Sequence, residues 1–114
     1  MHQLIAHLLN LYVPQAREYL VKAAREHRLV PYGEIMNRFG GRGYVGQVLD
    51  ALNRQEHGMG RPLLSAIVVR AEERQSSSGF FDLVRSLRPQ VTTNTQHQMW
   101  EAECDRVWAH YRSS

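Results

Sequence analysis

The side chains best suited to bind a ligand lie within residues 31–52, where PYGEIMNRFGGRGYVGQVLDAL reads as two helical segments broken by glycines. Two helices joined by a tight turn form the part of a helix-turn-helix that lies in a DNA groove. Arginine, glutamine and tyrosine supply donors that contact phosphates and base edges. The sequence predicts nucleic-acid contacts from Tyr32, Arg42, Tyr44, Gln47 and Arg54.

The second of these segments also has features of simple packing. Its outward face includes Asn53 beside Gln47 and Arg54, and Gly46 would let a nucleic-acid backbone approach closely. Asp50 lies in the middle of the same face, where a carboxylate repels phosphates. A solvated helix that only packs through its apolar side therefore stays open beside a helix that reads DNA.

The polar stretch RAEERQSSSG that begins at residue 70 resembles the tip of a hairpin, or wing, that touches phosphate. Arg70 and Arg74 would make those contacts. Glu72 and Glu73 lie between them, so the charge of the tip sums to zero. A solvated loop is the open alternative.

Two other groups contain residue types that occur in metal or catalytic sites, but their surroundings in the sequence do not predict a site. His97, Glu101 and Cys104 follow the i, i+4, i+7 spacing that can present metal ligands, but Cys104 belongs to the apolar stripe of its helix. Ser65 and His57 could suggest a hydrolase, yet Ser65 lies in an apolar run without a nucleophile-elbow motif. The sequence predicts no catalytic residue, no metal and no cofactor.

Apolar spacing predicts a mostly helical chain around these residues. The expected helices cover 3–12, the stretch from Pro14 to just before Pro31, about 35–39, 44–55, and a last helix that Thr95 caps. The run LLSAIVVR, residues 63–70, is the best candidate for a strand. The segment 79–87 is left open as a second strand or a short helix.

Two apolar stripes identify the expected core. The stripe of the fourth helix is Val45, Val48, Leu49 and Leu52. The stripe of the last helix is Trp100, Cys104, Val107 and Tyr111. We expect a single α+β domain over 1–114, mostly helical, with a winged-helix-like helix-turn-helix core, a small β-hairpin or strand pair, and a C-terminal helix.

The overall composition of the 114 residues is that of a globular protein, with 43% apolar and 22% charged residues. The formal charge is +3, and every basic residue except Lys22 is arginine. This excess of arginine suits phosphate binding but also follows from codon bias. With one cysteine and no basic leader or membrane span at the N-terminus, a reducing cytoplasmic setting is expected.

Aromatic residues in the last third of the chain suggest a protein contact. Trp108 lies one position off the main apolar stripe and is expected to be exposed between Arg106 and Arg112. Exposed tryptophan and arginine are frequent anchors of protein interfaces. Together with the amphipathic N-terminal helix, Trp108 and Arg112 leave a partner protein or a homodimer open.

Three short pieces of the chain resemble the DNA-binding half of the alkylguanine alkyltransferase and alkyltransferase-like family. The pieces are Tyr-Gly-Glu at 32–34, an arginine before Val-Gly at 42–46, and PLLSAIVV at 62–69, which is similar to the reactive Pro-Cys-His-Arg-Val-Val segment. Ser65 stands where the family has its alkyl-accepting cysteine, and Ala66 where it has a histidine. The arginine also lies one residue further from Val-Gly than in the family.

The resemblance implies a winged-helix-like scaffold on which Tyr32 and Arg42 approach a DNA backbone, without alkyl transfer because the thiolate and histidine are missing. The leading hypothesis is a non-enzymatic module that binds nucleic acid, most simply duplex DNA. The alternatives are a protein-interaction module on the same scaffold and an alkyltransferase-like protein that binds lesions.

Overall fold

The computed structural model describes residues 2–39, 41–70, 78–87 and 96–112, and for residues 2, 3, 5, 42, 78, 79, 81, 83 and 96 it describes the backbone alone. The helices are α1 (His2–Arg25), α2 (Tyr32–Arg38), α3 (Gly41–Gly58), α4 (Ser78–Leu87) and α5 (Gln96–Tyr111), with a 3₁₀ helix η1 (Leu64–Ile67). Two short strands, β1 (Val30–Pro31) and β2 (Val68–Val69), pair in parallel, with Val30 opposite Val68. The chain is therefore mostly helical with a small strand pair, an α+β arrangement.

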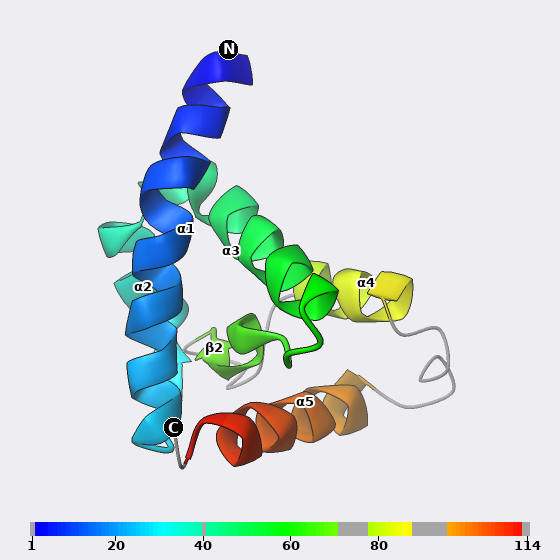
Figure 1. Ribbon diagram of the computed structural model, residues 1–114. Coiled ribbons are helices and arrows are strands. Elements are labelled where there is room, and N and C mark those ends of the chain that lie inside the picture. The colour runs from blue at the N-terminus through cyan, green and yellow to red at the C-terminus, as the bar shows by residue number, and fades with distance from the viewer. Residues whose placement is uncertain (1, 40, 71–77, 88–95, 113–114) are drawn as a thin grey trace.

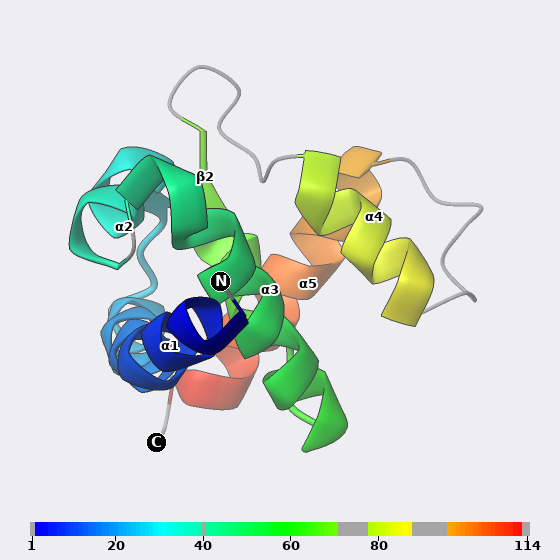
Figure 2. The same cartoon turned by 90° about the horizontal axis from the view of Figure 1, so that it is seen from above.

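The helices surround the segment that holds η1 and β2. Figure 1 shows α3 crossing beside α1, with η1 and β2 between α3 and α5. Seen from above, α2 and α4 lie on opposite sides of this central segment (Figure 2). One hydrophobic cluster joins every described α-helix to η1, and its fully buried residues include Leu20, Ile35, Leu52 and Ile67.

Both predicted apolar stripes are confirmed. Val45, Val48, Leu49 and Leu52 of α3 are all buried. In α5, Cys104, Val107 and Tyr111 are buried and Trp100 is partly buried against the same cluster. The i, i+3, i+4 spacing of apolar residues is sufficient here because each helix has one face on a single core.

The structure corrects the expected start of the chain. The prediction of two helices separated near Pro14 is wrong, because α1 runs without a break through that proline. An internal proline removes one backbone hydrogen bond at a cost of about 3 kcal/mol. The exposed Pro14 lies between Val13 and Ala16, which are buried in the core, and their burial offsets that cost.

The expected strand at 63–70 is also mostly wrong. Four of its residues, Leu64–Ile67, form η1, and only Val68 and Val69 pair as a strand. The segment 79–87, left open between strand and helix, is helical in α4. The expected cap Thr95 and the wing tip at 71–77 lie outside the described residues.

Candidate nucleic-acid interface

The α2–α3 unit has the predicted helix-turn-helix order. Phe39 ends α2 by donating its backbone N–H to the Ile35 carbonyl at 2.9 Å. Gly41 then starts α3 at a φ of 69°, in the left-handed region where glycine alone is unstrained. The Phe39 ring meets the rings of Tyr12 and Tyr19 edge to face, with centroids 6.3 and 5.8 Å apart. The turn is therefore anchored on α1.

Among the side chains that the structure describes, the outer face of α3 consists mainly of small residues and carries almost no net charge. Gly43, Gly46 and Gln47 are exposed on its first half, and Asp50 and Arg54 on its second half. The guanidinium of Arg54 lies 3.0 Å from the Asp50 carboxylate, so the two charges cancel. A Cβ added at Gly43 or Gly46 would meet no atom within 4 Å. Internal packing of this chain therefore does not require either glycine.

The predicted contact residues are only partly gathered on this face. Gln47 and Arg54 lie on it, whereas Tyr32 and Tyr44 are half-buried and Tyr32 packs against the core cluster. The backbone of Arg42 is in the first turn of α3, and its side chain lies outside the described residues.

Arg70 is exposed directly after β2, and β2 packs beside α2, as Figures 1 and 2 show. Arg74 lies outside the described residues. A hollow of about 460 Å³ between α1 and α2 is lined partly by Lys22, Arg25 and Arg38. Glu18 also lines this hollow, so its described side chains include three basic groups and one acidic group, whereas the described side chains on the face of α3 include one of each.

Asn53 does not lie on the outer face as expected. It is only 2% exposed, and its side-chain amide donates to the Ser65 hydroxyl at 2.5 Å. The backbone N–H of Ser65 donates back to the Asn53 side-chain oxygen at 3.2 Å. Asn53 lies at the edge of the apolar stripe, so its spacing predicts an outward side chain. It is buried instead because η1 covers that edge.

Side chains of α5 hold the same segment from the other side. The fully buried Glu103 carboxylate accepts the backbone N–H of Leu63 at 2.8 Å. The Trp100 ring N–H and the Cys104 thiol both donate to the Ala66 carbonyl, at 2.8 and 3.3 Å. Residues 63–66 thus connect α3 to α5 through side-chain hydrogen bonds. No local sequence pattern indicates this network.

The surroundings of Cys104 are apolar and acidic. Burial, with the nearby carboxylates of Asp105 and Glu103, raises the pKa of the Cys104 thiol from 9.0 to about 12. A thiol of this kind stays protonated and unreactive at neutral pH. His97 instead pairs with Glu101 on the exposed side of α5. Among the described residues, no group of three histidine, cysteine, aspartate or glutamate side chains could hold a metal ion.

A buried carboxylate in α3 organises the opposite end of that helix. Glu56 is fully buried and accepts hydrogen bonds from Arg17 of α1, at 2.5 Å, and from Arg61. Arg17 also reaches the Tyr111 hydroxyl at 3.4 Å, and burial and the charge of Glu56 raise the pKa of Tyr111. This cluster ties α1, α3 and α5 together.

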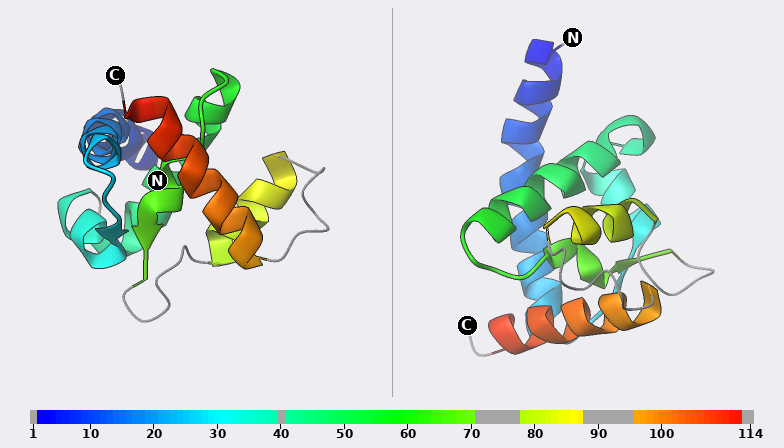
Figure 3. Two further views of the ribbon diagram at one scale, coloured as in Figure 1. Left: turned by 90° about the horizontal axis from the view of Figure 1, so that it is seen from below. Right: turned by 90° about the vertical axis from the view of Figure 1, so that its right-hand side faces the viewer.

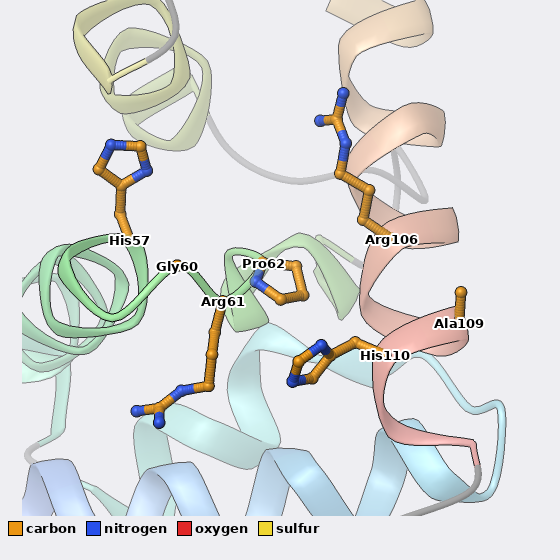
Figure 4. A pocket seen from close by; sticks show the side chains of 7 residues that line it. All are labelled: His57, Gly60, Arg61, Pro62, Arg106, Ala109 and His110. Atoms are coloured by element: carbon orange, nitrogen blue, oxygen red, sulfur yellow. The ribbon is translucent and has the colours of Figure 1, made fainter.

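A hollow of about 510 Å³ opens between the end of α3 and α5 (Figure 4). His57 and Arg106 stand on opposite sides of Pro62, and the Arg61 side chain points away from Arg106. Arg61 pairs with buried Glu56, and Arg106 with buried Glu103 at 2.7 Å. Both arginines are therefore already engaged by carboxylates of the core, and Glu56 shares its single negative charge between Arg61 and Arg17.

Trp108 differs from its expected exposure. It is half-buried, and its ring stacks on His27 with centroids 4.0 Å apart and planes inclined by 21°. His27 lies in the turn that follows α1 and has a φ of 53°, a left-handed conformation that glycine usually adopts after a helix. Arg112, the second expected interface residue, is exposed after α5.

Comparisons with protein-family models, with curated proteins and with solved structures found no match to this chain. Within the described residues, no helix is both long and apolar enough to cross a lipid bilayer. The fold and the site define a small, mostly helical protein with a short parallel strand pair, in which the first half of α3 exposes two glycines.

Proposed function

We propose that the chain is a non-enzymatic nucleic-acid-binding module of winged-helix type, with α2 and α3 against duplex DNA. The observation that carries the proposal is the first half of α3. Gly43, Gly46 and Gln47 are exposed there, and the helix has no acidic residue before Asp50. A surface of this kind accepts a phosphate backbone at close range.

The two glycines support close approach because they stabilise nothing in this chain. Glycine inside a helix costs about 0.5–1 kcal/mol relative to alanine. No neighbour fills the space where a Cβ would be at Gly43 or Gly46. A ligand that packs against bare backbone would benefit from the missing side chains, and the partial positive charge of a helix N-terminus favours an anion.

The hydrogen bonds to residues 63–66 also support the proposal, because they make the proposed interface helix rigid. They hold α3 in a fixed position relative to α5 and β2, and a preorganised helix loses less entropy on binding. In this arrangement Tyr32, Arg42, Tyr44 and Arg54 contact the DNA backbone around Gln47. Arg70 and Arg74 reach phosphates from the segment after β2.

A narrower form of the proposal follows from the resemblance to alkyltransferase-like proteins, which covers 32–34, 42–46 and 62–69. In this form the module binds alkylated DNA without removing the alkyl group. The hydroxyl of Ser65 is hydrogen-bonded to Asn53 in the core, which fits a structural role better than that of a nucleophile. The single cysteine fits a cytoplasmic setting for either form.

The test is a fluorescence-anisotropy titration with duplex DNA, with one matched pair of variants. Gln47→Glu and Gln55→Glu make the same chemical change at two exposed positions of α3, but Gln55 borders α1 rather than the proposed interface. A carboxylate facing phosphates at position 47 should weaken binding about fivefold or more, and Gln55→Glu should change it less than about twofold.

Three controls sharpen this titration. Binding to DNA should weaken steeply as salt is raised, whereas an apolar protein interface would not respond. Arg42→Ala tests the arginine expected at the start of α3. A duplex with one alkylated guanine separates general DNA binding from lesion binding. Absence of binding at low salt, or equal effects of the two glutamate variants, would contradict the proposal and favour a protein partner.

A further inference from the structure

The first turns of α1 carry leucines on a face that does not contact the core. Leu4 and Leu11 are 51% and 45% exposed, and with Met59 they are the large hydrophobic residues exposed in the described part of the chain. Leu8, one turn from each, is half-buried. Leu9 and Tyr12 of the same turns pack on the core instead. The N-terminal helix therefore has two apolar faces, of which only one is used.

This part of α1 is accessible to a partner. It projects beyond the rest of the molecule, as Figure 1 and the right-hand view of Figure 3 show. Leu4, Leu8 and Leu11 follow the 4–3 spacing of a coiled-coil seam, in which apolar residues of two helices interlock. We call these three residues the leucine seam.

The charge pattern of the chain favours a second copy as the partner. No aspartate, glutamate, lysine or arginine occurs between Met1 and Ala16, although 22% of the whole chain is charged. An uncharged apolar seam offers nothing to select a charged partner, and it brings no like charges together when it meets itself. Such a self-complementary patch suits a dimer with twofold symmetry.

The charges that follow the seam decide the direction of pairing. Glu18 and Lys22 are exposed on the continuation of the same face, seven and eleven residues after Leu11. Parallel helices would set Glu18 against Glu18 and Lys22 against Lys22 of the second copy. Antiparallel helices avoid both contacts, because the charged residues then lie past the end of the partner's seam.

We propose that the chain forms a weak antiparallel homodimer through the leucine seam, with Leu8 near the twofold axis and Leu4 against Leu11 of the second copy. The 4–3 spacing is nearly symmetrical about Leu8, so all three leucines are paired. A contact of two to three helical turns is small beside the roughly 800 Å² per partner of stable complexes, so we expect a dissociation constant of about 10–100 μM.

The test measures the oligomeric state of the full chain by sedimentation velocity over a range of concentrations. The double variant Leu4→Gln, Leu11→Gln should raise the dissociation constant at least about 30-fold, since four leucine side chains lose their burial. Met59→Gln is the matched control, because it removes an exposed hydrophobic residue outside the seam. At a concentration where all the proteins are monomeric, the thermal unfolding midpoints of the double variant and of Met59→Gln should match that of wild type. This match would show that the variants fold.

Cysteine cross-linking checks the direction. A mixture of Leu4→Cys and Leu11→Cys chains should form a mixed disulfide under mild oxidation, and Leu4→Cys alone should not. The native Cys104 is buried and does not compete. A wild type that stays monomeric, a double variant with unchanged association, or cross-linking of Leu4→Cys alone would each overturn the proposal. Binding of the monomer to neutral lipid vesicles would instead assign the leucine seam to a membrane surface.

Discussion

Asn53 of α3 and Ser65 of η1 form a mutual pair in the core, in which each residue donates one hydrogen bond to the other, at 2.5 and 3.2 Å. Both residues are almost fully buried. A buried amide that forms two such bonds contributes more than its own contact, because it fixes the position of two elements at once. The pair is therefore the most direct link between the proposed interface helix and the centre of the fold.

Asn53→Ala should lower the free energy of unfolding by about 2–3 kcal/mol, because it takes away both the acceptor of the Ser65 N–H and the donor to its hydroxyl. Ser65→Ala removes only the hydroxyl and should cost about 1 kcal/mol. Urea unfolding of both single variants and the double variant gives the coupling between them, which we expect to be about 1 kcal/mol. Additive effects would contradict the role assigned to this pair.

Gly46→Ala should raise the stability of the free protein by about 0.5–1 kcal/mol, because alanine is the better helix former and its Cβ meets no other atom. Gly41→Ala makes the same change in the same helix at a φ of 69° and should lower stability by about 1–2 kcal/mol. Thermal or urea unfolding measures both. Loss of stability in Gly46→Ala would mean that packing within the chain requires that glycine.

The succession of α2 and α3 and the apolar faces could be predicted from sequence because they depend on local information. Glycines at 40, 41 and 43 end one helical pattern, and apolar residues at regular spacing define the next. Both signals lie within a few residues of the structure they specify. The C-terminal helix follows from its apolar stripe in the same way.

The central segment could not be predicted because its conformation depends on distant residues. A run such as LLSAIVV has the composition of a buried strand. It becomes η1 where Asn53, twelve positions before Ser65, and Glu103, forty positions after Leu63, accept its backbone N–H groups. The burial of Asn53 has the same origin, so sequence spacing alone placed it on the outer face.

Glu56→Gln should destabilise the fold by about 2–3 kcal/mol, near the lower end of the range for breaking a buried ion pair. The carboxylate is fully buried, but the Arg17 and Arg61 side chains are 31% and 21% exposed, and water can partly solvate them once the charge is removed. Glu101→Gln is the control, since its pair with His97 is exposed and should contribute less than about 0.5 kcal/mol. Equal urea midpoints for the two variants would contradict this account of Glu56.

Cys104 should make the protein less stable as pH rises above 9. The folded state raises the pKa of this thiol from 9.0 to about 12, so below pH 9 both the folded and the unfolded chain keep the proton. Above pH 9 the unfolded chain releases it and the folded chain does not, which favours unfolding by about 1.4 kcal/mol per pH unit up to the folded pKa. Cys104→Ala lacks this contribution, so the change in stability between pH 8 and pH 10, measured by urea unfolding, should be about 1.4 kcal/mol smaller than in wild type.

Tyr111 also has a raised pKa, but it is present in both proteins and cancels in the comparison. Equal losses in wild type and variant, or rapid reaction of the native thiol with a disulfide reagent at pH 8, would show that Cys104 is not held as a buried neutral thiol.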